Sequence, residues 1–328
     1  MADARPDIDI VGSFVRLFGT DVLGILLEDR TTKHNVIWAD DEYSELGEGY
    51  QPYDDIVVEK ITGFRSGVIK TRTAKDAERQ AERTRRKAEV FTPSWLTNQM
   101  NNVFDDEWFG RTGVFNREVP GGWETNRERV EFSEDKGRGW RDFVDRRMLE
   151  ITCGEGPFLC SRYDATTGER IPVEDRTGIL DRKLRVVSEN ADDEAEWLDW
   201  AIRALEATYG YEYQGDNLVV ARINVALSFA EHMERRWGRM PGDQEIKRAA
   251  RVVAWNIWQM DGKNGCAPGE RTDRPPAEET EPRLFDLADY TVDTVEAGGQ
   301  GALPLYDVPC MIYDWRARKP QTFNSLKG

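Results

Sequence analysis

The chain has 328 residues, of which 39% are hydrophobic, and a formal net charge of -16 at pH 7. A chain of this length can bury a full core, as one large domain or two modest ones. The charge excludes a general nucleic-acid coat protein, because neutralising phosphates requires clustered Lys and Arg rather than an acidic surface. Any contact with DNA must therefore be local.

No apolar run approaches the length of a membrane helix, and the first seven residues lack the basic start and apolar core of a signal peptide. We therefore expect a cytoplasmic protein with no membrane partner. The four cysteines form no Cys-x-x-Cys pair, and His34 and His232 are far apart in sequence. This pattern predicts reduced thiols and no metal site.

Residues 1–69 are predicted to form a small β-rich region. Short runs rich in β-branched and aromatic residues alternate there with turn-forming residues, which is the pattern of strands. The runs cover residues 10–18, 22–27, 35–38 and 56–61. We expect them to form a separate unit ahead of the main domain.

Residues 70–89 are the one basic segment of the chain. They contain eight basic and four acidic residues, a local net charge of +4 that leaves -20 for the rest (-16 minus 4). On a helix, five basic side chains fall in one stripe opposite a face of alanines. These are Arg72, Lys75, Arg79, Arg83 and Arg86. The stripe predicts a helix that contacts DNA phosphates; the alternative is a solvated helix in which Glu78 and Glu82 pair with neighbouring Arg side chains.

Three helices are predicted in the second half of the chain. The first spans residues 192–209 behind an Asp cap, and the second begins at Asp216 and runs to about Trp237. The third keeps helical spacing of its apolar residues from Ile246 onward. Its expected end is near Gly262, because glycine is a common helix stop.

The most informative stretch lies ahead of these helices, at residues 149–159. An apolar strand candidate there runs into Glu150 and then into a turn that contains Gly154 and Gly156. Paired glycines let backbone amides approach a bound ligand closely, and a nearby carboxylate can hold an ammonium or hydroxyl group of that ligand. The stretch therefore indicates a nucleotide-cofactor loop.

Three stretches in order along the chain resemble the cofactor motifs of a known family. The first, Phe91-Thr92-Pro93, is similar to a Phe-x-Thr-Pro segment that lies over S-adenosylmethionine. The second, residues 150–159, is similar to Asp-Pro-Ala-Cys-Gly-Ser-Gly-x-Phe-Leu, and the third, residues 209–224, resembles Gly-x-Glu-x-Asn-Pro followed by an Ala-Arg-x-Asn helix. The chain thus resembles the adenine-specific DNA methyltransferases of restriction-modification systems, in particular modification subunits whose cofactor motifs come first in sequence.

This resemblance implies a Rossmann-like S-adenosylmethionine-dependent methyltransferase fold for residues 90–328, with a cofactor site of aromatic, glycine and acidic residues. These are Phe91, Thr92, Pro93, Glu150, Gly154, Gly156, Glu212 and Asp261. Glu212 would end the second strand and accept both ribose hydroxyls, and Glu150 would face the cationic methionine part of the cofactor. The alternatives are that Thr92-Pro93 begins a helix, that Glu212 is a surface carboxylate, and that Asp261 ends the third helix.

The catalytic Asn-Pro-Pro-Tyr loop of that family is missing here. Its nearest equivalent is residues 306–315, in which Ile312 takes the place of the asparagine. An isoleucine cannot accept hydrogen bonds from the amine of a flipped adenine. Asp314 and Trp315 offer a substitute acceptor and a stacking ring two residues further on, so the resemblance makes them the catalytic candidates.

Two other segments are alternative catalytic sites. Cys310 follows a proline, as does the attacking cysteine of cytosine carbon-5 methyltransferases, and residues 36–43 faintly resemble an Asp-Pro-Pro-Tyr loop in a permuted arrangement. Only 13 residues follow Trp315 (328 minus 315), whereas the family needs further strands. Residues 1–69 or a second chain would have to supply them.

The resemblance implies a DNA methyltransferase that transfers a methyl group from S-adenosylmethionine to a flipped base, with an adenine amine as the expected target. Its expected setting is a restriction-modification or phage-defence system, with DNA and a second subunit of that system as partners. The alternative is a non-catalytic subunit of the same fold that binds DNA or assists assembly. A third hypothesis, based on the charge of -16, is an acidic protein that mimics DNA.

Overall fold

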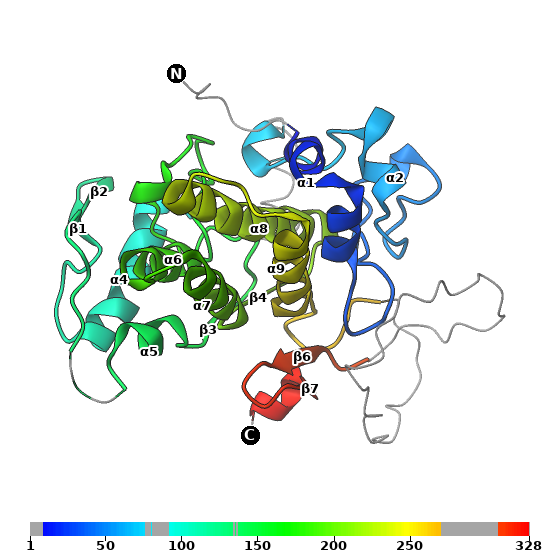
Figure 1. The fold of residues 1–328 in the computed structure, drawn as a ribbon. Helices are drawn as coiled ribbons and strands as arrows, with labels where there is room; N and C mark the ends of the chain where they lie inside the picture. The colour runs from blue at the N-terminus through cyan, green and yellow to red at the C-terminus, as the bar shows by residue number, and fades with distance from the viewer. Residues whose placement is uncertain are drawn as a thin grey trace.

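The computed structural model describes residues 9–75, 80, 92–133, 135, 137–269 and 308–327. At its centre is a three-stranded parallel sheet in the order β3-β4-β5, made of Met148–Glu150, Thr208–Glu212 and Ile257–Gln259. In its register Glu150 lies beside Gly210, and Glu212 lies beside Gln259. The expected mixed α/β architecture with parallel strands is therefore confirmed (Figure 1).

Four helices connect the strands of this sheet. α6 (Ile179–Asn190) and α7 (Glu194–Glu206) lie between β3 and β4 in the chain, and α8 (Gly215–Trp237) and α9 (Asp243–Asn256) lie between β4 and β5. Both connections move the chain one strand further in the same direction across the sheet. Because parallel crossovers are right-handed, this places all four helices on one face. Figure 1 shows them packed against one another.

The opposite face of the sheet is covered by a C-terminal hairpin. Its strands β6 (Met311–Asp314) and β7 (Lys319–Thr322) pair antiparallel and do not join the central sheet. Ile312 packs there with Tyr211 and Trp258, which point to this face from β4 and β5. Residues 311–314, within the nearest equivalent of the family's catalytic loop, are therefore a strand of this hairpin.

The remaining elements surround this core. In chain order they are α1 (Ile10–Leu27), η1 (Ser44–Leu46), α2 (Val58–Ile61), η2 (Gly63–Arg65), η3 (Arg72–Ala74), α4 (Ser94–Phe109), β1 (Asn116–Val119), β2 (Gly122–Thr125), α5 (Trp140–Val144), η4 (Val173–Asp175) and η6 (Phe323–Lys327). β1 and β2 form a short antiparallel hairpin of their own, beside α4.

The prediction of a β-rich N-terminal region is wrong. Residues 10–18 and 22–27 lie in α1, and the runs at 35–38 and 56–61 form only isolated bridges and the short helix α2. The buried side chains of α1 recur at helical spacing: Ile10, Val11, Phe14, Val22, Leu23, Leu26 and Leu27. They pack against α8 and α9, and this burial outweighs the strand preference of the β-branched residues.

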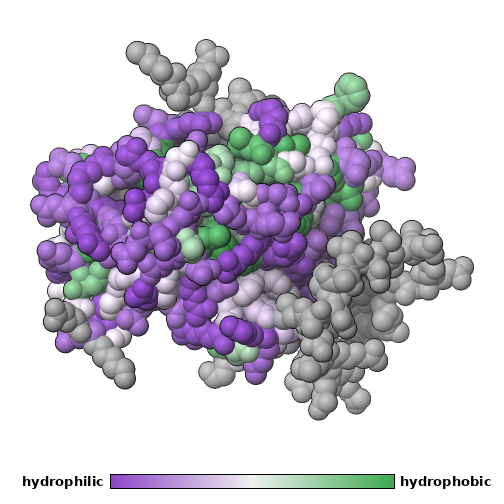
Figure 2. Space-filling model, in the orientation of Figure 1, coloured by the Kyte–Doolittle hydropathy of each residue, from purple (hydrophilic) through white to green (hydrophobic). Residues whose placement is uncertain are grey.

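α1 is also long and apolar enough to cross a membrane by length and composition alone, with a mean hydropathy of 1.8 over 18 residues. The expectation that no run reaches membrane length is therefore wrong. One such helix is weak evidence, because the core helix of a soluble protein and a signal sequence pass the same test. The non-helical backbone of Gly19 (φ 82°, ψ 169°) interrupts the helix. Figure 2 shows hydrophobic residues gathered over α1 on an otherwise largely hydrophilic face.

Two of the three predicted helices are confirmed as α7 and α8. Asp193 caps α7 as expected, because its side chain accepts a hydrogen bond from the amide of Glu196. α7 stops at Glu206, three residues short of the prediction, because Thr208 and the residues after it pair in β4. α8 ends at Trp237, where Gly238 takes a left-handed φ of 71°.

The third predicted helix is α9, which ends at Asn256 rather than near Gly262. Residues 257–259 form β5 and pair with β4. Helical spacing continues through Ile257 in the sequence, but pairing with a neighbouring strand overrides it. Asp261 therefore follows a strand, as the family resemblance implies, and does not end a helix.

Candidate functional site

The carboxyl ends of the three parallel strands meet at one edge of the sheet, which we call the carboxyl edge. Glu150 is the last residue of β3, Glu212 is the last residue of β4, and Asp261 comes two residues after β5. Ligands of open α/β sheets bind outside the carboxyl ends of the strands. The structure thus brings three of the predicted cofactor residues to the edge where a ligand is expected.

The predicted glycine loop is a tight turn directly after β3. Thr152, Gly154 and Gly156 all have positive φ angles, of 50°, 54° and 82°. The amide of Gly156 donates to the carbonyl of Cys153 at 2.8 Å, which closes the turn. An added Cβ at Gly156 would make only an ordinary contact with Ala221 of α8, so its left-handed backbone, and not a lack of space, favours glycine there.

Glu212 is buried and holds this turn against β4. One carboxylate oxygen accepts a hydrogen bond from the amide of Gly154 at 2.8 Å, and the other accepts from the amide of Gln214 at 3.1 Å. Burial raises the pKa of Glu212, while these amide donors lower it in part. The side chain therefore holds the predicted cofactor loop in place, and its alternative as a plain surface carboxylate is wrong.

Glu150 lies one strand away and has a different environment. It is half-buried, and no described residue donates a hydrogen bond to its carboxylate. Burial raises the pKa of this carboxyl group to about 7. A cationic ligand group placed beside it would favour the ionised form, so Glu150 is the acidic residue of the edge that a ligand can use directly.

The N-terminal segment lies against the same edge. The amide of Ile37 donates to the side chain of Gln259 at 2.9 Å, the side-chain amide of Gln259 donates back to the carbonyl of Ile37, and the amide of Gly215 donates to the carbonyl of Trp38. An added Cβ at Gly215 would lie 2.0 Å from the carbonyl oxygen of Ile37, so only glycine fits. Residues 36–43, the permuted alternative, are therefore at the carboxyl edge.

Two aromatic residues that the sequence did not single out also lie there. Tyr213 follows Glu212 directly and is 40% exposed, and Tyr53 is exposed as well. Burial raises the pKa of Tyr213, and the charges of Asp261, Tyr53 and Asp40 raise it further. The position of Tyr213 beside a strand-ending acid is the only sequence signal that could have identified it.

Lys75 is inside the protein and does not project to solvent. Its ammonium group pairs with Asp216 at 2.8 Å, and both side chains are almost fully buried. The hydroxyl of Tyr43 donates to the same carboxylate oxygen at 2.8 Å. The assignment of Lys75 to an outward phosphate-binding stripe is therefore wrong, because a buried carboxylate at the first turn of α8 requires a cation beside it.

The rest of the predicted stripe is only partly described. Arg72 lies in η3, a short turn, and its backbone amide donates to the side chain of Glu155 in the cofactor loop. Arg79, Arg83 and Arg86 lie outside the described residues, as does Phe91 of the cofactor set. The DNA contact therefore stays a prediction.

Thr92 and Pro93 come directly before α4. The helix begins at Ser94, whose amide donates to the side chain of Asp164 at 2.7 Å. The helix-start alternative is thus correct in position, although Asp164 rather than Thr92 satisfies the first amide. No described contact joins Thr92 or Pro93 to the carboxyl edge.

The Ala-Arg-x-Asn part of α8 has two structural tasks that sequence reasoning missed. Buried Arg222 donates to the carbonyls of Leu26, Glu28, Ala254 and Ile257, at the ends of α1 and α9. Asn224 donates to the carbonyl of Glu155 and to the hydroxyl of Tyr163, which in turn donates to the Glu155 side chain at 2.7 Å. The helix therefore holds the back of the predicted cofactor loop.

Asp314 and Trp315 lie at the opposite end of the sheet. The indole N–H of Trp315 donates to Asn256, which precedes β5, and Asp314 lies 3.9 Å from Arg147, which precedes β3. Asp314 also accepts two amide hydrogen bonds within its own hairpin turn. The structure does not bring these two residues to the predicted cofactor loop: the hairpin places them at the amino ends of the strands.

The cysteines are free, buried thiols, as expected. Burial raises the pKa of Cys310, whose sulfur lies 3.4 Å from the carbonyl of Gln259. A thiol kept protonated in this way is a poor nucleophile, which argues against the Cys310 alternative. Among the described residues, no three His, Cys, Asp or Glu side chains are grouped to hold a metal ion.

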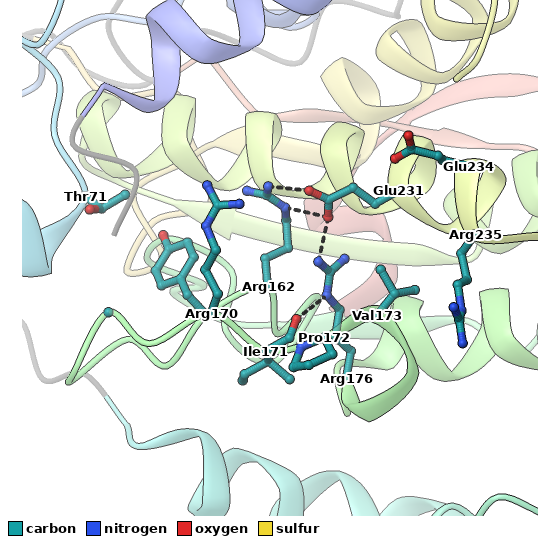
Figure 3. A pocket seen from close by; sticks show the side chains of 12 residues that line it. Thr71, Arg162, Arg170, Ile171, Pro172, Val173, Arg176, Glu231, Glu234 and Arg235 are labelled. Atoms are coloured by element: carbon teal, nitrogen blue, oxygen red, sulfur yellow. Dashed lines mark hydrogen bonds and ion pairs between the residues drawn. The ribbon is translucent and has the colours of Figure 1, made fainter. Parts of the chain in front are cut away.

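A pocket of about 530 Å³ lies behind the cofactor loop, between α8 and the residues around η4. Figure 3 shows Arg162 and Arg176 converging on Glu231, each at 2.6 Å. Burial alone would raise the pKa of Glu231, but the two guanidinium groups lower it to about 2. None of the predicted site residues lines this pocket, whose lining has four Arg and two Glu side chains. We therefore assign the candidate site to the carboxyl edge.

No family model, curated protein or solved structure matches this chain. The function therefore has to be inferred from the chemistry of the carboxyl edge.

Proposed function

We propose that the chain binds S-adenosylmethionine at the carboxyl edge and acts as a DNA methyltransferase-like protein of a restriction-modification or phage-defence system. The observation that carries the proposal is the placement of Glu150 and Glu212 at the ends of adjacent parallel strands, on either side of a left-handed glycine turn. In this interpretation β3, β4 and β5 form one half of a Rossmann-like methyltransferase sheet.

The charge of the edge supports this cofactor over a phosphate-bearing one. Glu150, Glu212 and Asp261 all contribute carboxyl groups there, and they attract the sulfonium and ammonium groups of S-adenosylmethionine while repelling phosphates.

The target base is proposed to lie against residues that the N-terminal segment brings to the edge. Tyr213 and Tyr53 offer exposed rings for stacking, and Asp40 and Asp261 offer acceptors for an exocyclic amine. An adenine amine, as the donor of two hydrogen bonds, is the target that fits acidic acceptors. The base-binding residues would then come from the permuted segment and from the strand ends.

Titration calorimetry with S-adenosylmethionine tests the cofactor site. Glu150→Gln removes the one edge carboxylate without a described hydrogen-bond donor, and we expect it to weaken binding at least about ten-fold, the value of one charge-assisted interaction. Wild-type affinity is also expected to rise with pH through about 7, as Glu150 ionises, and the variant should lack this dependence.

Glu45→Gln, an exposed change in η1, is the matched control and should leave the affinity unchanged. Absence of binding heat in the wild type, or equal affinities for wild type and Glu150→Gln, would contradict the proposal.

The second candidate function is a non-catalytic, DNA-binding or assembly subunit of the same fold. Two observations favour it. Asp314 and Trp315 lie at the amino ends of the strands, opposite the carboxyl edge, and the central sheet has only three strands among the described residues, with β3 at its edge. Transfer of a labelled methyl group to mixed-sequence DNA separates the two candidates. Robust transfer by the isolated chain supports the enzyme, and cofactor binding without transfer supports the subunit.

A further inference from the structure

Two arginines in the pocket between α8 and η4 have unused hydrogen-bond donors. Their side chains are more than nine-tenths buried, with 8% of Arg162 and 6% of Arg176 exposed. Arg162 donates twice to Glu231 and once to Asn224. Arg176 donates to Glu231, to the carbonyl of Ile171 and, at 3.5 Å, to a serine hydroxyl of α8. A guanidinium group has five N–H donors, so these three bonds leave two donors in each residue without a described acceptor.

Thr71 adds an unused hydroxyl group to the same pocket. The residue is 2% exposed, and its Oγ1 has no hydrogen-bond partner in the part of the chain that the structure describes. Buried polar groups of folded proteins almost always have a partner, supplied by the protein, by water or by a ligand. A ligand with several acceptor oxygens would satisfy this hydroxyl and the buried guanidinium groups together.

The charge of the lining favours an anion as that ligand. The lining contains four arginines and two glutamates: Arg162, Arg170, Arg176, Arg235, Glu231 and Glu234. Its net charge is therefore +2 (four minus two), in a chain whose total is -16. Guanidinium groups bind oxyanions with charge-assisted hydrogen bonds, and phosphate is a preferred partner.

Three further carboxylates lie near the pocket without lining it. Each already has a described donor or cation beside it: Glu155 the hydroxyl of Tyr163, Asp181 the hydroxyl of Ser228, and Glu174 the guanidinium of Arg235. The Arg235–Glu174 pair spans 3.6 Å between exposed side chains. Solvent screens such a pair, so a bound anion can compete for Arg235.

The size and shape of the pocket indicate an organic anion. Its volume of about 530 Å³ lies within the range of small-molecule sites, roughly 300–1,000 Å³. Ile171, Pro172 and Val173 give it an apolar wall. Figure 3 shows Thr71 and Arg170 on one side of the two buried arginines, and Glu234 and Arg235 on the other. Basic and hydroxyl groups thus lie at one end, and an exposed carboxylate lies at the other.

We propose that this pocket binds a nucleoside monophosphate. The phosphate lies between Thr71, Arg170 and Arg162, because its three terminal oxygens can accept from several donors at once. The ribose hydroxyls donate to Glu234, as acidic side chains accept them in other nucleotide sites. The base packs against the apolar wall.

This pocket is separate from the carboxyl edge, although it touches the same loop. Tyr163 lines the pocket and donates to the side chain of Glu155 at 2.7 Å, and Asn224 accepts from Arg162 and donates to the carbonyl of Glu155. Glu150 does not line it. The proposal therefore does not rest on the proposed function.

Titration calorimetry of the full chain with the four ribonucleoside monophosphates, each at low salt, tests the proposal. We expect at least one of them to bind. Its nucleoside and inorganic phosphate should each bind at least about ten-fold more weakly, because each lacks one half of the contacts. Affinity should fall as the salt concentration rises, since salt screens the attraction between phosphate and guanidinium groups.

Two variants connect the binding to this pocket. Arg170→Gln removes an exposed guanidinium group, and Thr71→Val removes a hydroxyl that has no described bond to lose. Each is expected to weaken binding at least about ten-fold. Circular dichroism establishes that both are folded, and Thr71→Val, which keeps the side-chain shape, carries the test if Arg170→Gln is not.

Arg248→Gln removes a half-exposed arginine of α9 that pairs with Asp199, and it is the matched control. It should bind as the wild type does, and so should Glu150→Gln, which separates this result from that of the cofactor titration. S-Adenosylmethionine should not compete with the bound nucleotide.

Four results would overturn the proposal. They are no binding of any of the four nucleotides, equal affinity for the nucleotide and its nucleoside, wild-type affinity in both pocket variants, and displacement by S-adenosylmethionine. A short single-stranded oligonucleotide is the last probe. If it bound more tightly than every mononucleotide and lost affinity in both variants, the pocket would belong to a nucleic-acid site instead.

Discussion

Glu150 and Glu212 end neighbouring strands, yet their surroundings give them different tasks. Glu212 accepts from the amide of Gly154 in the predicted cofactor loop and from the amide of Gln214 after β4, and it therefore stabilises the turn before any ligand binds. The Glu150 carboxylate is partly buried and accepts no hydrogen bond from a described residue, which is why its pKa lies near 7. Ionising a partly desolvated carboxyl group of this kind costs stability, and a cationic ligand beside it can offset that cost.

The raised pKa of Glu150 predicts how stability depends on pH. The pKa rises from 4.5 in the unfolded chain to about 7 in the folded protein, so the folded state binds the proton more tightly. Its contribution to stability is therefore present below pH 4.5 and is lost as the pH rises to about 7. Glu150→Gln removes this loss and should be more stable than wild type at pH 8.

The expected gain at pH 8 is about 1 kcal/mol, after allowance for solvent screening of a half-buried group, and it should shrink towards zero at pH 4.5. Urea unfolding of wild type and Glu150→Gln at both pH values measures it. If the stability difference between wild type and Glu150→Gln were the same at pH 4.5 and pH 8, the Glu150 carboxyl group would not titrate between these pH values.

At the scale of elements, the N-terminal segment is held to the first turn of α8 by a buried ion pair. Lys75 reaches Asp216 across 141 positions of sequence, and Tyr43 donates to the same carboxylate. Gly215, the first residue of α8, contacts Ile37 so closely that no side chain fits at this position. The segment from residue 36 to 75 is therefore part of the carboxyl edge and not a separate unit.

The ion pair predicts strong coupling between these elements. Lys75→Met or Asp216→Asn alone leaves one buried group without its partner, and each is expected to cost about 3 kcal/mol of the free energy of unfolding. The double variant should cost clearly less than the sum, because neither charge is then left alone. Urea denaturation of the four proteins gives the coupling energy, and additive losses would mean that the two groups do not interact.

Across the whole molecule, the two ends of the sheet carry different groups. The carboxyl edge gathers acidic and aromatic side chains, whereas the amino ends anchor the C-terminal hairpin through Trp315 and Asp314. Asn256 links that hairpin to the sheet, since its own amide donates to Leu205 and Thr208 while its oxygen accepts from Trp315. The hairpin is therefore a support of the sheet.

Trp315→Phe tests this division. The change removes the indole donor and leaves the buried oxygen of Asn256 without it, which should lower stability by about 1–3 kcal/mol. The affinity for S-adenosylmethionine should remain that of wild type, the reverse of the pattern expected for Glu150→Gln. Thermal unfolding and calorimetry on the same sample measure both effects, and a large loss of affinity in Trp315→Phe would return this residue to the binding site.

The fold and the site were predictable to different degrees. Helical periodicity and an Asp cap correctly located α7 and α8, and a strand ending in Glu150 ahead of paired glycines correctly located the turn. The same periodicity was present in residues 10–27, but the β-branched content of that run obscured it. Local preference is weak there, and packing on α8 and α9 decided the outcome.

What the sequence alone determined is local: which runs are amphipathic, where glycines allow a left-handed turn, and which acidic residues come at the ends of strands. The tertiary structure alone decided which strand ends share an edge, that Lys75 is buried against Asp216, and that Asp314 and Trp315 lie at the far end of the sheet. The physical reason is the separation along the chain between the residues that come into contact. Hydrogen bonds and packing between residues more than a hundred positions apart leave no period in the sequence, and those contacts are the ones that assemble a site.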